Sequence, residues 1–294
     1  MVLLSLTACG TGDLDDMFTT GADSANAVAA YYDVLTAITL DSWRDQAAYD
    51  ALRDVPASAT LDQSYEKRIQ ALGRRAGLAR QVAALYTVMT KSGDAAGLRN
   101  ISTAGAALGA SLQGLPTLPG ATNLEPDAFG QAAQFFFDVK RRKDLLRGLK
   151  GMQTVLSGMQ TVFERETPAY ARISKERNET AEHLLALLSE KKIVNPGALL
   201  KTLPLGVTIS TRSNEQARAA GLAIAKIDVF RATFSWDCAT RESALVLAGL
   251  NDGQKQAVAG TSPDLRNLRR HIGSANGCLA EYKQIAKVAD EHTK

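Results

Sequence analysis

The stretch from Leu145 to Leu187 reads LLRGLKGMQTVLSGMQTVFERETPAYARISKERNETAEHLLAL. Taken at alternating steps of three and four residues, its positions are apolar except for Glu166, Arg177 and Thr180. The complete series is Leu145, Leu149, Met152, Leu156, Met159, Phe163, Glu166, Tyr170, Ile173, Arg177, Thr180, Leu184 and Leu187. Such spacing keeps one stripe of a long helix facing partner helices. We therefore predict an all-α fold, an elongated bundle of about five to seven helices around this one long helix.

Two prolines bear on the long helix. Pro126 suits the first turn of a helix, so we expect the helix to begin there. Pro168 lies inside the apolar series, where proline removes a backbone donor and clashes with the preceding turn. We therefore predict a kink or a short break at Pro168.

The composition agrees with packed helices. Hydrophobic residues make up 45% of the chain and aromatic residues only 6%, which favours closely packed helices over β-sandwiches. The formal net charge of +3 comes without a concentrated basic face, so we expect no nucleic-acid partner. No run approaches the roughly 20 consecutive apolar residues that span a bilayer.

The chain starts with a short apolar run, Met1 to Leu6, followed by Thr7, Ala8 and Cys9. Leu6-Thr7-Ala8-Cys9 resembles the lipobox of bacterial lipoproteins. This resemblance implies that Cys9 carries a diacylglyceryl group and becomes the mature N-terminus, so that residues 1–8 are a signal-peptide remnant. Gly10 follows where an Asp would mark inner-membrane retention, which implies an outer-membrane lipoprotein facing the periplasm or the cell surface.

The targeting signal departs from the usual pattern in two ways. No Lys or Arg precedes Cys9, and the apolar core is shorter than the roughly 7–15 residues of a secretory signal. We therefore expect further residues upstream of Met1. The alternative interpretation is an ordinary apolar N-terminus with a chance cysteine.

Three segments are expected in the chain as given: the remnant, a tether and a folded domain. Residues 9–23 are rich in Gly, Thr and Asp and are interpreted as a tether. Residues 24–294 are expected to form a single helical-bundle domain. Its first helix would be capped by Asp23 or Ser24, and its second would start with the capping box Thr60 to Gln63.

Later helices are also marked by their patterns. The second helix carries basic residues that we interpret as a solvated face: Lys67, Arg68, Arg74, Arg75 and Arg80. Another helix is expected to start with the capping box Ser213 to Gln216 and to end at Asn251 to Gly253. Its predicted core stripe is Ala217, Ala220, Ile224, Ile227, Phe230, Phe234, Cys238, Leu245 and Ala248. Ser262 would cap the last helix.

From Asn100 to Leu124 the chain has no charged residue. We interpret this stretch as a buried helix that ends in a turn rich in Pro and Gly. The alternative is an insertion element like those of helical pore-forming toxins, although glycines and prolines disfavour an isolated spanning helix.

Candidate sites are few. Lys140, Arg141, Arg142 and Lys143 form the densest basic patch; it is either an anion-binding patch or a solvated helix face. Glu176, Glu179 and His183 lie near one another on a helix, but no second Glu-x-x-His motif accompanies them. We interpret these three residues as exposed ion-pairing groups and expect no metal and no cofactor.

No catalytic residues are predicted. The sequence has no Gly-x-Ser-x-Gly elbow, no phosphate loop and no nucleophile with an obvious base. Paired carboxylates that depend on the fold cannot be recognised from sequence, so a lytic or sensor enzyme remains a third functional class.

Cys238 and Cys278 are expected to form a disulfide. If Cys9 carries lipid, two cysteines remain in an oxidising compartment. They lie on consecutive helices joined by a connection predicted at about Asn251 to Thr261, at similar heights on either side of it. The alternative is a pair of buried free thiols.

Together, these features predict a lipid-anchored bacterial cell-envelope protein that acts as an interaction or scaffold module. The expected partners are the membrane, through the lipid on Cys9, and another envelope protein or the cell-wall polymer. The alternative function is a helical pore-former or its accessory component, which would use the uncharged stretch from Asn100 to Leu124.

Overall fold

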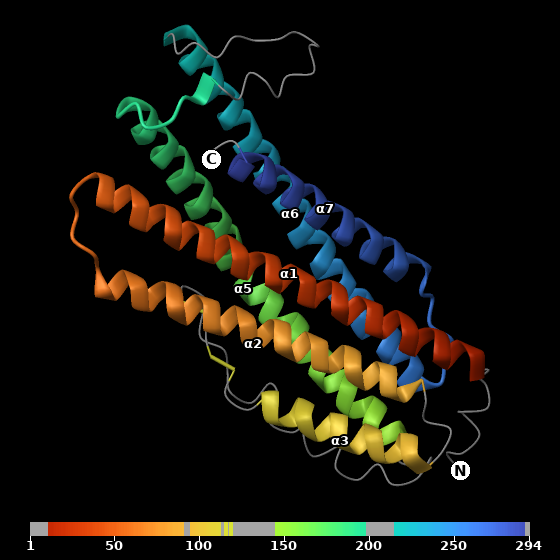
Figure 1. The fold of residues 1–294 in the computed structure, drawn as a ribbon. Coiled ribbons are helices and arrows are strands. Elements are labelled where there is room, and N and C mark those ends of the chain that lie inside the picture. Colours follow the sequence, from red (N-terminus) through yellow and green to blue (C-terminus); the bar gives the residue numbers. More distant parts are fainter. Residues whose placement is uncertain are drawn as a thin grey trace. The chain divides into compact units, whose positions relative to one another are not determined.

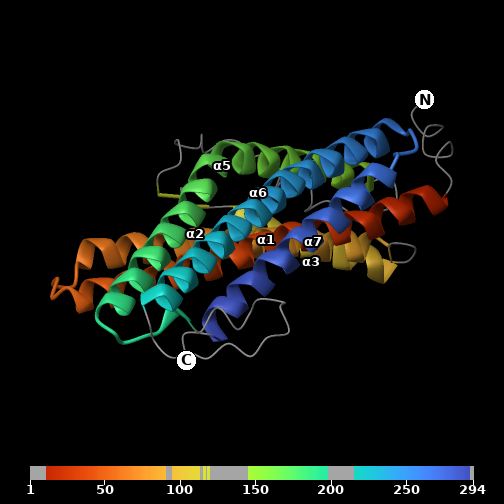
Figure 2. The same cartoon turned by 90° about the horizontal axis from the view of Figure 1, so that it is seen from above.

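The computed structural model describes residues 11–90, 95–112, 115–116, 118–119, 145–197 and 215–291. Within these ranges the chain forms six helices and no strand, which confirms an all-α helical bundle (Figure 1). The helices are α1 (Thr11–Leu52), α2 (Ala59–Met89), α3 (Ala95–Leu112), α5 (Leu145–Glu190), α6 (Glu215–Ala259) and α7 (Arg266–Glu291). Figure 2 shows the same helices from above.

The helices are divided between two compact units. The first unit comprises Met1–Asp33, Gln70–Ala169 and Ala239–Asn276. The second comprises Val34–Ile69, Tyr170–Cys238 and Gly277–Lys294. Each of α1, α2, α5, α6 and α7 therefore contributes one part to each unit, whereas α3 belongs to the first unit alone. A single domain over residues 24–294 stays a prediction.

The core of the first unit is built on the seam of α5, by which we mean the predicted apolar series from Leu145 to Leu187. Its five apolar positions from Leu149 to Phe163 are all buried, namely Leu149, Met152, Leu156, Met159 and Phe163. From α1, the rings of Tyr31 and Tyr32 pack on Phe163, with ring centroids 5.2 and 6.1 Å away. The prediction of one long helix with a continuous buried stripe is confirmed for these residues.

Of the kink or short break predicted at Pro168, the break is wrong, because α5 continues through this residue; the kink stays a prediction. Proline cannot donate to the carbonyl of Glu164 four residues earlier. Both Pro168 and Glu164 are exposed, so water can reach the carbonyl that has lost its helical partner. A proline on the solvent side of a long helix is tolerated for this reason.

The expected start of the first helix at Asp23 or Ser24 is wrong, because α1 already begins at Thr11. The Ser24 hydroxyl does not cap a helix; it donates to the carbonyl of Thr20 within α1 at 2.7 Å. Met17 and Phe18 are buried in the first unit. These apolar side chains extend the buried face of α1 backwards, so residues 11–23 are helical rather than a tether.

Gly21 is a packing glycine and not a flexible one. A Cβ atom at Gly21 would lie 2.8 Å from the nearest ring carbon of Tyr86 on α2. The Tyr86 ring is fully buried, its hydroxyl donates to Gln254 Oε1 at 2.8 Å, and Gln254 Nε2 donates to the Leu149 carbonyl at 2.8 Å. The absent side chain thus allows α1 and α2 to approach closely around a fixed aromatic ring.

Two further helix ends differ from the predictions. At the start of α2, the hydroxyl of Ser58 accepts a hydrogen bond from the Leu61 amide at 3.4 Å, so Ser58 takes the place predicted for Thr60. The predicted end of α6 at Gly253 is wrong, because the helix continues to Ala259. Gly253 instead makes room for the Met17 side chain, since a Cβ at Gly253 would lie 3.2 Å from the Met17 sulfur. Gly260 follows the last residue of α6, and its φ of 76° suits glycine just after a helix end.

The start of α7 is shifted from its predicted cap. Ser262 lies four residues before the helix, which begins at Arg266. The Asp264 carboxylate accepts a hydrogen bond from the Arg266 amide at 3.1 Å, and this bond holds the pKa of Asp264 below its usual value. Asp264 therefore caps α7 in place of Ser262.

Arg75 is the exception on the predicted solvated face of α2. It is buried, with Nε donating to Glu166 Oε2 at 2.5 Å and Nη2 contacting the other carboxylate oxygen. Glu166 is one of the residues that interrupts the apolar seam of α5. One buried ion pair between α2 and α5 therefore explains why Arg75 is not solvated and why Glu166 stands in the apolar series of α5.

The uncharged stretch from Asn100 onwards supplies the larger part of α3, in which Ile101, Leu108 and Leu112 are buried. This agrees with the interpretation as a buried helix. Pro116 and Pro119 lie beyond the end of α3. Among the residues that the structure describes, no helix is both long and apolar enough to cross a membrane.

The second unit is held by aromatic and polar contacts. Between α1 and α2, the Trp43 ring stacks on Tyr65 at 5.9 Å and the Trp43 indole donates to Asp62 at 2.7 Å. Between α2 and α5, Arg68 pairs with Glu176 at 2.6 Å.

Candidate interaction surface

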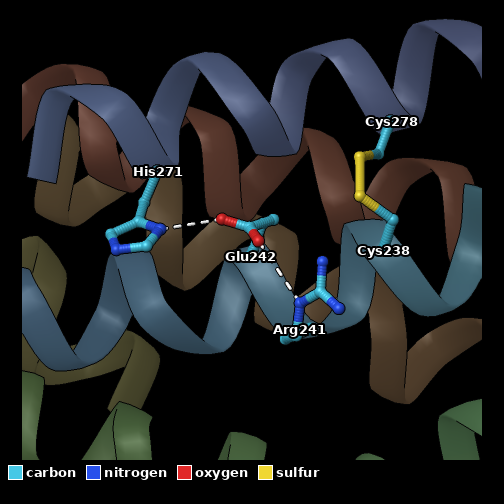
Figure 3. Close-up of a disulfide and its surroundings, with 5 residues drawn as sticks. All are labelled: Cys238, Arg241, Glu242, His271 and Cys278. Carbon is cyan, nitrogen blue, oxygen red and sulfur yellow. Dashed lines mark hydrogen bonds and ion pairs between the residues drawn. A yellow bond between two sulfur atoms is a disulfide. The ribbon is translucent and has the colours of Figure 1, made fainter. Parts of the chain in front are cut away.

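Cys238 on α6 and Cys278 on α7 lie side by side in the second unit (Figure 3). Their Cα atoms are 5.9 Å apart and their sulfur atoms 2.03 Å apart. The predicted proximity of the two cysteines is confirmed. The predicted connection is displaced, because α6 ends at Ala259 and α7 starts at Arg266.

The two helices run antiparallel in this unit. Trp236, which precedes Cys238 on α6, packs against Tyr282, which follows Cys278 on α7, with ring centroids 5.7 Å apart. Burial raises the pKa of the Tyr282 hydroxyl. The covalent link therefore lies beside a buried aromatic contact, and together they fix the orientation of this part of α6.

In the first unit, α6 and α7 are joined by an ion pair. His271 Nδ1 lies 2.7 Å from Glu242 Oε2, and Arg241 Nε lies 3.3 Å from Glu242 Oε1 (Figure 3). The hydrogen bond with His271, followed by that with Arg241, holds the pKa of the Glu242 carboxyl below its usual value. The carboxylate thus stays charged between the His271 ring and the Arg241 guanidinium.

The most unusual surface in the described residues is an apolar stripe on α6 in the second unit. Ile227, Phe230 and Phe234 are 59, 72 and 69% exposed. Their spacing of three and four residues places them on one face of the helix. We call this set the α6 stripe. These residues were predicted to face the core, so that prediction is wrong.

The buried face of α6 lies opposite the stripe. Trp236 is buried there together with the small residues Ala232, Ser235 and Ala239. Small side chains allow α6 to approach its neighbours closely, and they carry little hydrophobic signal in the sequence. The larger apolar residues at Ile227, Phe230 and Phe234 therefore dominated the pattern and pointed to the wrong face.

The two exposed phenylalanines form a substantial apolar patch. At roughly 150–250 Å² for each fully buried aromatic side chain, exposures of 72 and 69% correspond to roughly 200–350 Å² for the pair. The largest patch on a typical monomer is about 300–600 Å² and is often functional. The α6 stripe is therefore a candidate interaction surface.

Charged residues flank the stripe. Arg231 is paired on both sides, with Asp228 and Glu281 at 3.9 Å each. Lys226 and Asp237 are exposed, and neither has an ion pair or hydrogen bond with another described residue. These two charges are available to a partner.

A cleft of about 340 Å³ lies between α5 and α6 in the second unit. Three exposed carboxylates, those of Glu179, Glu182 and Asp237, line it, and Glu179 is paired with Lys175 at 3.6 Å. Ser174, Asn178 and Thr233 line it as well. Within the cleft, Asn178 Nδ2 on α5 donates to the Thr233 hydroxyl on α6 at 2.9 Å.

The three residues considered for metal binding have separate contacts. Glu176 pairs with Arg68 on α2 and Glu179 with Lys175 on α5. The His183 ring lies 6.1 Å from the Tyr49 ring on α1. Within the described ranges, no group of three His, Cys, Asp or Glu residues could hold a metal ion.

Two predicted sites lie outside the described residues. These are the lipidation site at Cys9 and the basic patch Lys140, Arg141, Arg142 and Lys143. Comparison of the chain with protein-family models, with curated proteins and with solved structures finds no match.

Proposed function

We propose that this chain is a lipid-anchored protein of the bacterial cell envelope that acts as an interaction or scaffold module, and that the α6 stripe is its contact surface. The observation that carries the proposal is the exposure of Ile227, Phe230 and Phe234 on one helix face. Contiguous exposed apolar side chains rimmed by charges are typical of protein interaction sites.

The chemistry of the stripe also favours one of the two expected partner classes. The stripe residues Ile227, Phe230 and Phe234 offer the many hydroxyl and amide groups of a cell-wall polymer no hydrogen-bond donor or acceptor. An apolar face on a partner protein would remove these side chains from water, at about 25 cal/mol per Å² of buried apolar surface. We therefore propose an envelope protein as the partner, with the lipid on Cys9 holding the module at the membrane.

The contact is tested by a photo-crosslinking amino acid at position 230, incorporated in cells that make the protein. We expect a specific crosslinked product that is lost when Phe234→Asp is added. The matched control is the same amino acid at position 193, because Ile193 is also exposed and lies in the turn after α5 rather than on α6. Equal products at positions 230 and 193, or none at 230, would contradict the proposed contact surface.

The anchor is tested separately. Each buried CH₂ of an acyl chain adds about 0.8 kcal/mol of membrane binding, so Cys9→Ser should move the protein from the membrane to the soluble fraction. A wild-type protein that is already soluble, when made with its natural upstream sequence, would contradict the anchor. Dye release from liposomes by the purified protein would instead support the pore-forming alternative.

A further inference from the structure

We propose that the partner of the α6 stripe is a second copy of this chain, paired with it as an antiparallel helix dimer about a twofold axis. This inference rests on the proposed function and names the partner of the same surface. It is argued from the spacing of the exposed side chains, the two available charges and the area of the patch.

The apolar side chains of the stripe are self-complementary when two copies run antiparallel. A twofold axis level with position 232 places Phe230 of one copy opposite Phe234 of the other. The same axis places Phe234 opposite Phe230, so both ring pairs meet at the centre. Offset or edge-to-face contacts between such rings add to the burial of their apolar area.

The two available charges fit the same arrangement. Lys226 and Asp237 are eleven residues apart, close to three whole turns of 3.6 residues, so they lie on the same side of the stripe. An antiparallel twofold pair brings equal sides of the two helices together. Lys226 lies six residues before the axis and Asp237 five residues after it. Lys226 of one copy and Asp237 of the other therefore differ by only about 1.5 Å in their positions along the helix axis, and the ammonium meets the carboxylate.

Arg231 lies on the opposite side of the stripe, where the Arg231 side chains of the two copies would face each other across the twofold axis. Its charge is already paired with Asp228 and Glu281 in the same chain. Repulsion between the two arginines is reduced accordingly. The net arrangement is therefore two new opposite-charge pairs around an apolar centre, the usual anatomy of an interface with an apolar core and a polar rim.

The area is sufficient as the centre of a dimer interface. The phenylalanines of two copies bring together roughly 400–700 Å² of apolar surface. A stable interface buries at least about 1,200 Å² in total. Ile227 and the flanking exposed residues, among them Ala223, Lys226 and Arg231, supply the remainder around the two ring pairs.

Analytical ultracentrifugation of the full chain tests the inference, with Cys9→Ser used to keep the protein free of lipid. We expect a reversible monomer–dimer equilibrium. Phe230→Asp should raise the dissociation constant by about a hundredfold or more, because the change acts twice at the centre of a symmetric interface. Ile193→Asp, an equal change at an exposed residue in the turn after α5, should leave it unchanged.

A charge reversal tests the register. Asp237→Lys should raise the dissociation constant by about tenfold, since two opposite-charge pairs become two like-charge pairs. Adding Lys226→Asp to Asp237→Lys reverses both members of each pair and should restore the wild-type value. At concentrations where the wild type is monomeric, thermal unfolding of every variant must match the wild type, so that a lost dimer is not a lost fold.

The inference is overturned by a chain that stays monomeric at the highest soluble concentration, by a dimer that Phe230→Asp leaves intact, or by a double reversal that fails to restore pairing. A monomer that still gives a crosslink at position 230 to a different protein would overturn self-pairing and leave the proposed function standing. A monomer with no crosslink there would contradict both.

Discussion

Replacing Gly21 with alanine should destabilise the protein, although alanine is the better helix former. A methyl group at Gly21 would lie 2.8 Å from ring carbons of Tyr86, well inside van der Waals contact. The ring cannot withdraw freely, because the Tyr86 hydroxyl is bonded to Gln254 and Gln254 is bonded to the Leu149 carbonyl. The methyl group therefore forces either α1 or this hydrogen-bonded chain to move.

The magnitude follows from two opposing effects. Overpacking a well-ordered core costs about 1–3 kcal/mol, and replacing glycine by alanine inside a helix recovers up to about 1 kcal/mol. We expect Gly21→Ala to lower the free energy of unfolding by about 1–2 kcal/mol. Gly73→Ala on α2 is the matched control, because nothing lies within 4 Å of a Cβ there, and it should raise stability by about 0.5–1 kcal/mol.

Guanidinium unfolding followed by far-ultraviolet circular dichroism measures both variants. The order expected is Gly73→Ala above wild type and Gly21→Ala below it. A Gly21→Ala protein as stable as Gly73→Ala would refute the close approach of α1 to the Tyr86 ring, and with it the assignment of residues 11–23 to a packed helix.

Further predictions concern the core of the first unit. Leu156→Ala and Phe163→Ala should each cost about 2–5 kcal/mol in the same unfolding measurement, and losses below half a kcal/mol at both would mean that the buried face of α5 is wrong. Arg75→Met should cost about 3–5 kcal/mol by leaving the Glu166 carboxylate buried without its partner; the double variant Arg75→Met/Glu166→Leu should recover most of the loss, and no recovery would contradict the pair. Burial raises the pKa of Tyr86, so its contribution to stability is complete below the unfolded pKa of about 10 and is lost as the pH rises above it. The wild type should therefore lose more stability than Tyr86→Phe between pH 9 and pH 11, and an equal loss would contradict this assignment.

The sequence predicted the parts of the fold that depend on many residues at once. The seam of α5 repeats over twelve steps, so single interruptions such as Glu166 do not hide its period. Contact between α6 and α7 was also predictable, because consecutive helices fold back on each other. The equal heights used to pair Cys238 with Cys278 do not hold, because Cys238 lies 21 residues before the end of α6 and Cys278 12 residues after the start of α7.

Signals carried by one residue were less reliable. Gly21 was assigned to a tether and Gly253 to a helix end, but both make room for a large side chain, that of Tyr86 or Met17. A glycine in a sequence indicates only that the position has no side chain. The sequence alone does not say whether the glycine is needed for backbone freedom or for the close approach of a neighbour. Ser24 and Thr60 are likewise residue types common at helix starts. The buried side chains of Met17 and Phe18 nevertheless extend α1 before Ser24, and Ser58 rather than Thr60 accepts the hydrogen bond at the start of α2.

The candidate surface could not be found from the sequence for a related reason. α6 has one face of large apolar side chains and an opposite face of Trp236 with small residues. Hydrophobicity favours the first as the core, but tight packing of several helices favours the second, because small side chains permit short distances between axes. Only the three-dimensional arrangement shows that Phe230 and Phe234 are the ones left outside.

The central claim is that the α6 stripe is open in the isolated chain and covered in the envelope. The rate at which a thiol reagent modifies Phe230→Cys tests this directly, with Ile193→Cys as the reference. In dilute purified protein both cysteines should react at similar rates. In the native envelope, position 230 should react about tenfold more slowly, as expected if it is covered for most of the time, and position 193 should be unchanged. Equal reactivity of position 230 in both settings would contradict the claim, as would protection of that position in purified protein diluted until it is monomeric.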